Sequence, residues 1–125
     1  MPPKRPDDIS CAAYCGDPKT IGQIKTRLAD LEVTVDIFRA LGDETRFKLV
    51  YALRHGELCV CDLARVVDMT VAAVSYHMRY LRSLRLVRHD KRGKYVYYRL
   101  DDDHVADLVS IALAHSREEA GRRKK

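Results

Sequence analysis

The sequence lacks an apolar run long enough to cross a membrane and lacks the features of a secretory leader. A transmembrane helix needs about 20 consecutive, mainly apolar residues, and no such run occurs in these 125 residues. The early basic residues Lys4 and Arg5 are followed by Pro6-Asp7-Asp8 instead of an apolar stretch, which does not fit a signal peptide. These absences predict a cytoplasmic protein without a membrane partner.

Cysteine is scarce, and the four cysteines form two close pairs. Cys11 and Cys15 lie near the N-terminus, and Cys59 and Cys61 lie near the middle of the chain. In a reducing cytosol, paired thiols indicate metal binding or redox chemistry more than structural disulfides. A thiol–disulfide oxidoreductase is disfavoured because the spacing is not C-x-x-C and no βαβ pattern is present. We therefore predict neither an enzyme nor a small-molecule organic substrate.

Acidic residues are almost missing from residues 70–99. This segment holds eight basic residues and one acidic residue, a net charge of +7, whereas the whole chain carries +5. Localised positive charge with interleaved tyrosines is typical of a nucleic-acid-binding face, although a solvated surface is the ordinary alternative. The basic residues are Arg79, Arg82, Arg85, Arg88, Lys91, Arg92, Lys94 and Arg99.

Helical periodicity predicts a series of short helices that ends in a helix-turn-helix. Asp43 and Thr70 stand where N-caps are expected, and a turn at Val67-Asp68-Met69 separates the last two helices of the series. Two short helices joined by three or four residues, with basic residues following, match the helix-turn-helix layout. The predicted helices cover residues 19–41, 44–55, 57–67 and 70–83.

The helix over residues 70–83 has the composition expected of a recognition helix. At about 100° per residue, Val71, Val74, Met78 and Leu81 fall on one stripe and should face the core. The opposite face and its flanks carry small, aromatic and basic residues that can touch base edges and phosphates in a major groove. The candidate DNA contacts are Thr70, Ala72, Ser75, Tyr76, His77 and Arg79.

A change of period after residue 86 predicts a β-hairpin. Residues 87–91 and 95–100 read as strands around a turn containing Gly93. The cations Lys91, Arg92 and Lys94 at its tip suit a wing along the phosphate backbone, although a plain solvated hairpin is equally consistent.

A final helix over residues 101–118 is apolar on two stripes. It therefore needs two partners: its own core and a second subunit.

The predicted fold class is therefore mainly α with a small β-hairpin wing: a homodimeric winged helix-turn-helix protein. The length allows one compact domain plus an arm. We expect a flexible cysteine-bearing arm over residues 1–16, a DNA-binding and dimerisation domain over residues 17–118, and a basic tail over residues 119–125.

The cysteines form the first candidate metal site. In a regular helix Cys59 and Cys61 would point about 200° apart, so they can share an ion only at a helix that is just starting. A helix N-terminus also favours a thiolate. Cys11 and Cys15 on the arm offer two further ligands, and four thiolates suit a soft ion such as Cd(II), Pb(II) or Zn(II).

The last helix carries a second candidate site. His104 and His115 are eleven residues apart, so they share a face but lie about 16 Å apart and cannot bind one ion within one chain. In an antiparallel pair of such helices, Asp102 and His104 of one chain would meet His115 and Glu118 of the other and form two sites suited to Zn(II). Ordinary surface histidines with carboxylate neighbours remain the alternative.

Three strings of residues resemble the ArsR/SmtB family of metalloregulators over residues 31–118. Met78 departs from the leucine that usually follows the histidine, and Ala64 stands where the arsenic-sensing branch has a third cysteine. The arm cysteines and the last-helix residues instead resemble the cadmium- and lead-sensing CadC branch. The strings are Glu57-Leu58-Cys59-Val60-Cys61-Asp62-Leu63, Ser75-Tyr76-His77-Met78, and Gly93-Lys94 followed by Tyr97-Tyr98-Arg99-Leu100.

The resemblance implies a homodimeric repressor that binds double-stranded operator DNA and releases it when metal binds. It implies that the four cysteines form the sensor site, and that the last-helix set resembles the zinc-responsive site of the SmtB branch. Two alternatives stay open. An As(III)/Sb(III) sensor is consistent with three thiolates around a trigonal ion, and cysteine oxidation could drive release in place of a metal.

Overall fold

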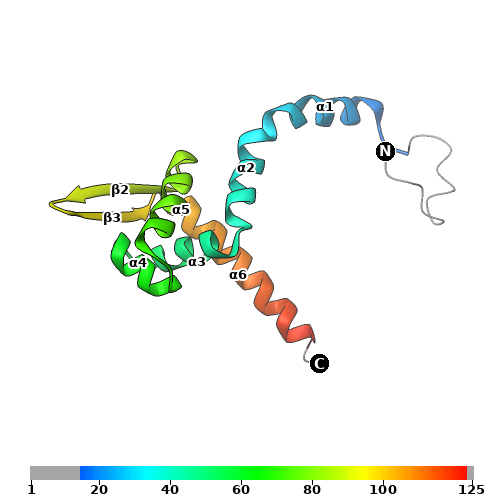
Figure 1. The fold of residues 1–125 in the computed structure, drawn as a ribbon. Coiled ribbons are helices and arrows are strands. Elements are labelled where there is room, and N and C mark those ends of the chain that lie inside the picture. The colour runs from blue at the N-terminus through cyan, green and yellow to red at the C-terminus, as the bar shows by residue number, and fades with distance from the viewer. Residues whose placement is uncertain (1–14, 124–125) are drawn as a thin grey trace. The chain divides into compact units, whose positions relative to one another are not determined.

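The computed structural model describes residues 15–123 and divides into two compact units, the first ending at Thr34 and the second beginning at Val35. No helix among the described residues is long and apolar enough to cross a membrane. The elements of the second unit, which carries the helix-turn-helix, are drawn in Figure 1. Cys11 lies outside the described residues.

The first unit contains α1 (Pro18–Leu28) and the short 3-10 helix η2 (Ala29–Leu31). Helix α1 begins where Asp17 accepts hydrogen bonds from the backbone N–H groups of Lys19 and Thr20, at 3.4 and 3.3 Å. Such a side-chain cap satisfies donors that have no partner within the helix. Residues 15–34 of this unit are all exposed, including the apolar side chains of Ile21, Ile24, Leu28 and Leu31.

The second unit is a helical body with a three-stranded antiparallel sheet, and the β2–β3 hairpin projects beyond the helices (Figure 1). Its core is made of apolar residues from every helix, and Leu49, Leu63, Met78 and Leu81 are among those fully buried. Helix α2 (Glu32–Leu41) contributes Ala40 and Leu41 to this core. The remaining elements are α3 (Glu44–Leu53), β1 (Leu58–Cys59), α4 (Val60–Val67), α5 (Val71–Ser83), β2 (Val87–Arg92), β3 (Tyr95–Leu100) and α6 (Asp103–Arg123).

Local capping explains the helix-turn-helix of α4 and α5. Asp68 takes a left-handed conformation with φ of 54° and ends α4, while Met69 N–H donates back to the carbonyl of Ala64 at 3.0 Å. The hydroxyl of Thr70 then accepts from the N–H of Ala73 at 3.1 Å and starts α5. The predicted N-caps Asp43 and Thr70 are thus confirmed, as is the winged helix-turn-helix fold class.

The strand order β1-β3-β2 gives the wing a third strand that was not predicted. Strand β1 pairs with β3 through Leu58 opposite Tyr98 and Cys59 opposite Tyr97. The hairpin turns at Gly93, whose φ of +62° is a conformation that glycine adopts without a side-chain clash. The helix predicted over residues 57–67 therefore begins only at Val60, because the residues before it are paired with the wing.

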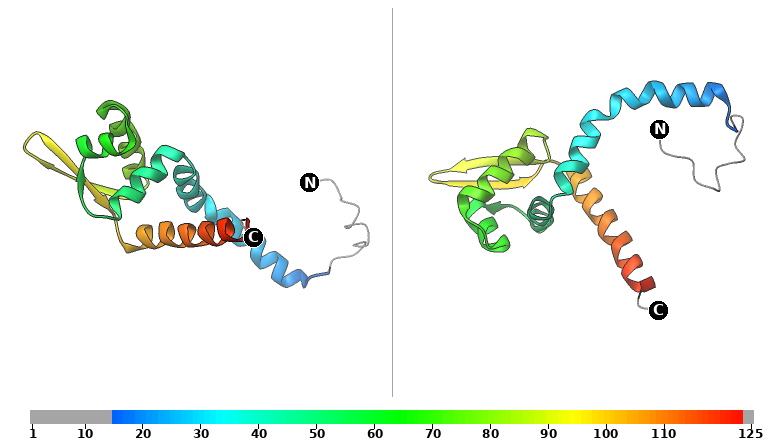
Figure 2. Two further views of the ribbon diagram at one scale, coloured as in Figure 1. Left: turned by 90° about the horizontal axis from the view of Figure 1, so that it is seen from below. Right: turned by 45° about the vertical axis from the view of Figure 1, so that its right-hand side comes forward.

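Two further expectations are corrected by the structure. Val71, predicted to face the core, is 43% exposed because it lies in the first turn of α5, before the helix reaches the core at Val74. The last helix begins at Asp103 and runs to Arg123, so residues 119–123 are helical, although a tail was predicted there. Figure 2 shows the C-terminal half of α6 extending away from the wing. Its buried face, at Val105 and Val109, packs where α6 contacts α3 and β3.

Candidate metal centres and nucleic-acid interface

Cys59 and Cys61 occupy the junction between a strand and a helix. Cys59 has an extended backbone, with φ of −76° and ψ of 158°, and it stands at the N-cap position of α4 without a side-chain capping bond. Cys61 lies in the first turn of α4 and is exposed, whereas Cys59 is buried. The two cysteines therefore do not sit in one regular helix, which removes the 200° separation that would keep their thiols apart.

This junction is attached to the wing on one side and, through α4, to α5 on the other. Through β1 it pairs with the wing strand β3, and α4 packs against α3 and against the recognition helix α5. The α4 side chains that make these contacts include Leu63 and Ala64, both buried. A shift at Cys59 is thus transmitted through a backbone ladder and a packed helix, because close-packed interiors do not absorb displacement freely.

The β1–α4 junction holds two of the four predicted cysteine ligands. Among residues 15–123, no three histidine, cysteine or carboxylate side chains lie close enough together to hold an ion. Cys59 and Cys61 provide two soft donors, and the remaining cysteines are Cys15 in the first unit and Cys11 outside the described residues. The donor chemistry fits a thiophilic ion, and a closed site requires ligands from outside the β1–α4 junction.

The candidate ligands of the last helix are exposed along α6. Asp102 accepts the N–H of Val105 at 3.3 Å through Oδ1, and its Oδ2 lies 3.4 Å from Nδ1 of His104. The His104 side chain is 93% exposed, and His115 and Glu118 are exposed farther along the helix. The structure thus brings Asp102 and His104 together at the start of α6 and leaves His115 and Glu118 three turns away.

The recognition helix α5 presents most of its predicted DNA contacts to solvent. Ala72, Tyr76 and Arg79 are exposed, and the side chain of Ser75 is half-buried. Val74, Met78 and Leu81 are fully buried on the opposite side. An exposed face carrying a small, an aromatic and a basic residue has the shape and donors that a major groove accepts.

His77 is held against the neighbouring helix α3. Its Nδ1 lies 3.5 Å from Nη1 of Arg46, whose Nε donates to the carbonyl of Ala40 at 2.9 Å and whose guanidinium covers the ring of Tyr80 at 4.6 Å. The Arg46 backbone N–H donates to Asp43, and this bond lowers the pKa of the Asp43 carboxyl most, with further lowering by the charges of Arg46 and His77. His77 thus helps to seat α5 on α3 in this structure.

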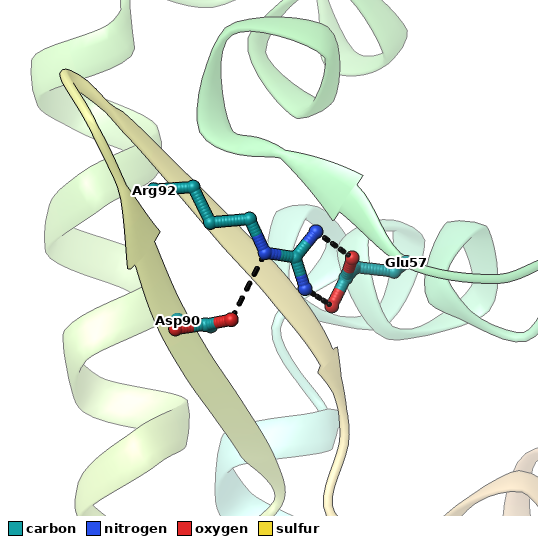
Figure 3. Close-up of polar contacts among 3 residues, drawn as sticks. All are labelled: Glu57, Asp90 and Arg92. Carbon is teal, nitrogen blue, oxygen red and sulfur yellow. Dashed lines mark hydrogen bonds and ion pairs between the residues drawn. The ribbon is translucent and has the colours of Figure 1, made fainter.

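The three predicted wing cations fall into two kinds. Lys91 and Lys94 are exposed, and no carboxylate in the described part of the chain pairs with either of them. The guanidinium of Arg92 instead donates to both carboxylate oxygens of Glu57, at 2.7 and 3.0 Å, and to Asp90 at 2.9 Å (Figure 3). Hydrogen bonds to Glu57 and then to Asp90 raise the pKa of Arg92 above its ordinary value.

Sequence reasoning missed Glu57, Asp90 and Arg46 as partners of predicted contact residues. Glu57 and Arg92 are 35 residues apart, and their approach follows only from the pairing of β1 with β3. The period-2 signal that marked β2 and β3 cannot appear in a strand of two residues. The signal that was available is the acidic residue Glu57, two residues before Cys59.

Comparison with known proteins agrees with this architecture. Residues 43–89 match the family described as bacterial regulatory protein, arsR family. A cadmium resistance transcriptional regulatory protein CadC homolog of Staphylococcus aureus is 48% identical over 85 residues, covering 67% of this chain and 70% of that protein. A transcriptional repressor SmtB homolog of Synechocystis sp. is 45% identical over 83 residues, covering 66% of this chain and 63% of that protein.

A solved structure agrees at the level of the fold. The homodimeric winged helix-turn-helix DNA-binding domain of a Mycobacterium bovis protein aligns with a TM-score of 0.71 and 22% identity, over 88% of this chain and 95% of that one. At this identity, the likeness shows that the two chains share a fold. The relatives are transcriptional regulators and repressors, not enzymes. With a family match across the helix-turn-helix and this identity to the staphylococcal regulator, the chain belongs to the ArsR/SmtB family of transcriptional repressors.

Proposed function

We propose that this protein represses transcription as a homodimer on double-stranded operator DNA and leaves the DNA when Cd(II), Pb(II) or Zn(II) binds to Cys11, Cys15, Cys59 and Cys61. The observation that carries the proposal is the position of Cys59 and Cys61 at the β1–α4 junction. That junction is joined to the wing by β1 and to the recognition helix by α4. The names of the CadC and SmtB relatives support a metal as the effector.

Apolar surface that the described residues leave exposed supports the dimer. Exposed Ile21, Ile24 and Leu28 recur along α1 at helical spacing, and Ile111 on α6 is 69% exposed. Such surface is stabilised when a second copy covers it. In a dimer, the two α5 helices would enter successive major grooves, about 34–36 Å apart. Thr70, Ala72, Ser75, Tyr76 and Arg79 then face bases and phosphates, with Lys91 and Lys94 on flanking phosphates.

The chain's own residues define the mechanism of release. A bound metal would supply bonds that fasten the arm thiolates to the thiolates of Cys59 and Cys61. Cys59 belongs to the sheet that carries the wing, and Cys61 to the helix that supports α5. A displacement of this junction tilts the wing and α5 together, and the half-site spacing of the dimer is lost. Coupling between two binding sites is typically about 1–3 kcal/mol.

The last-helix residues form a second proposed site. Asp102 and His104 of one chain and His115 and Glu118 of its partner would hold Zn(II) between two α6 helices. Nitrogen and carboxylate oxygen donors suit this ion. The contact between Asp102 and His104 and the exposure of all four residues support the proposal. We assign this site no role in release.

The test uses a fluorescent DNA duplex selected from a random-sequence library by the metal-free protein, called here the selected duplex. Reduced protein bound to it is titrated anaerobically with Cd(II), Pb(II), Zn(II) and As(III) in turn, and anisotropy reports release. Release by Cd(II), Pb(II) or Zn(II) at about one metal per cysteine site supports the proposal. Release by As(III) alone moves the arsenic alternative ahead. Release only after an oxidant is added supports the redox alternative.

A further inference from the structure

The bridge between Glu57 and Arg92 joins the cysteine segment to the wing. Both carboxylate oxygens of Glu57 accept from the two terminal nitrogens of Arg92, at 2.7 and 3.0 Å. Such a bidentate pair fixes orientation as well as distance. Glu57 lies two residues before Cys59, and Arg92 is the last residue of β2. Figure 3 shows the Arg92 side chain crossing the sheet from the wing to reach Glu57.

Arg92 also contacts Tyr97, the residue that pairs with Cys59. Its guanidinium lies 4.7 Å from the centre of the Tyr97 ring. Tyr97 is paired with Cys59 across β1 and β3, and with Asp90 across β2 and β3. Residues opposite one another in an antiparallel pair project from the same face of the sheet. Cys59, Tyr97, Asp90 and Arg92 therefore share one face, and Arg92 connects it to Glu57.

The charges around Arg92 make it a poor phosphate ligand in this structure. Three of its N–H groups already donate to carboxylate oxygens. Glu57, Asp90 and Arg92 together carry a net charge of −1, so an approaching phosphate meets two carboxylates beside one cation. Within residues 15–123, no carboxylate forms an ion pair with Lys91 or Lys94. We therefore assign the phosphate contacts of the wing to Lys91 and Lys94 and a different role to Arg92.

We propose that the Glu57–Arg92 bridge is a coupling link that makes the position of the wing follow the position of Cys59. The inference rests on the proposed function, since it concerns how a change at the cysteine site reaches the DNA. A shift of Cys59 moves Glu57, and Glu57 carries the guanidinium at the tip of β2 with it. Glu57 and Arg92 are positioning residues, and the wing lysines touch the DNA.

The test compares Glu57→Gln, Arg92→Gln, Arg92→Lys and the double variant Glu57→Gln/Arg92→Gln with Lys91→Gln. Lys91→Gln is the matched control, because it removes a neighbouring wing cation that has no carboxylate partner. Surface ion pairs contribute little to folding, so all five variants are expected to fold. Affinity for the selected duplex is measured by anisotropy with and without Cd(II), and the ratio of the two dissociation constants is the release factor.

The four link variants should lose most of the release factor. Allosteric effects of this kind are typically about 5- to 150-fold, and each link variant should retain about two-fold. The double variant should lose no more than either single variant. Arg92→Lys should also lose most of the release factor, because lysine keeps the charge but cannot form the bidentate pair with Glu57. Without metal, these variants should bind the selected duplex nearly as well as the wild type.

Lys91→Gln should behave in the opposite way. It should weaken metal-free binding, lower the slope of log affinity against log salt by about 1, and keep the full release factor. Hydrogen exchange of metal-free protein gives an independent reading, in which the link variants loosen the β2–β3 amides and Lys91→Gln does not.

Two results would overturn the link. One is Arg92→Gln reproducing the salt-slope loss of Lys91→Gln, which makes Arg92 a phosphate contact. The other is Glu57→Gln keeping the full release factor. A wild-type release factor of one is a different failure: it refutes the proposed function. The exchange data then still decide whether Glu57 holds the wing.

Discussion

The two candidate metal-binding regions differ in how their residues are placed in the fold. Cys59 and Cys61 lie at a junction whose strand belongs to the wing sheet and whose helix packs on the recognition helix. His104 and His115 lie on the exposed surface of α6, whose C-terminal half extends away from the wing. Cys59 is 9% exposed, whereas the His104 side chain is 93% exposed. The cysteine region is therefore part of the packed winged helix-turn-helix fold, whereas the histidine region consists of surface side chains.

This difference bears on which region can regulate DNA binding. A ligand shifts an equilibrium only through contacts that differ between the two states. Displacement at the cysteine junction must change the β1–β3 ladder and the packing of α4. The proposed zinc ligands His104 and His115 are exposed side chains of α6 and belong neither to the β1–β3 ladder nor to α4. We therefore expect strong coupling to DNA from the cysteines and weak coupling from the histidines.

The largest expected effect is the loss of metal-driven release in Cys59→Ser. The variant removes a soft donor from the strand that pairs with the wing, so the release factor should fall from a typical value of about 5- to 150-fold to about 1. Binding of the selected duplex without metal should be unchanged, because Cys59 is buried away from the exposed face of α5. Anisotropy with and without Cd(II) measures both quantities. Wild-type release by this variant would refute the assignment.

An intermediate effect, on the free energy of unfolding, is expected from a change in helix α3, which contacts elements of both regions. Helix α3 contacts α4 and α6, and Asp43 caps it by accepting the N–H of Arg46 at 3.0 Å. Losing such a cap costs about 1 kcal/mol, so Asp43→Ala should lower the free energy of unfolding by that amount at neutral pH. Urea denaturation followed by circular dichroism measures it. Asp43→Asn, which keeps a capping oxygen, is the control and should lose less.

The same cap predicts a pH dependence. The pKa of Asp43 is below its ordinary value of 3.8 in the folded chain. Its stabilisation is therefore complete above pH 3.8 and is lost as the pH falls through the lower folded pKa. The stability difference between wild type and Asp43→Ala should shrink under these acidic conditions. A difference that stays constant with pH would show that the carboxylate charge contributes nothing.

The smallest expected effect is that of His115→Gln on release. The His115 side chain is exposed on α6, ten residues beyond the buried Val105. The Cd(II) release factor should stay within about two-fold of the wild-type value, well inside the usual range of allosteric coupling. The same anisotropy titration measures this release factor, and His104→Gln serves as a second variant of the last-helix ligands. Loss of release in both variants would contradict the expectation that the histidine region couples weakly to DNA binding.

Local patterns were enough to predict the recognition helix and the wing hairpin. Thr70 begins α5, and Val74, Met78 and Leu81 face the core, as a period of 3.6 residues requires. Gly93 turns the hairpin as predicted. Each of these features depends on residues that are close in sequence, so their signals survive in the sequence alone.

The features that sequence reasoning missed depend on distant pairing. Strand β1 is two residues long and exists because β3 lies beside it, about 40 residues later in the chain. The Glu57–Arg92 bridge depends on that pairing, so the sequence alone does not show that two carboxylates accept from the Arg92 guanidinium. The four-cysteine assignment stays a prediction, because Cys11 lies outside the described residues and Cys15 belongs to the first unit.

The most direct test of the central claim follows metal binding and DNA release in one sample. Cd(II) is added to the reduced protein on the selected duplex, while ultraviolet charge-transfer absorption reports cadmium–thiolate bonds and anisotropy reports release. The account predicts that both signals change together, saturate at the same Cd(II) concentration, and disappear together in Cys59→Ser. Release without the thiolate absorption, or thiolate absorption without release, would contradict it.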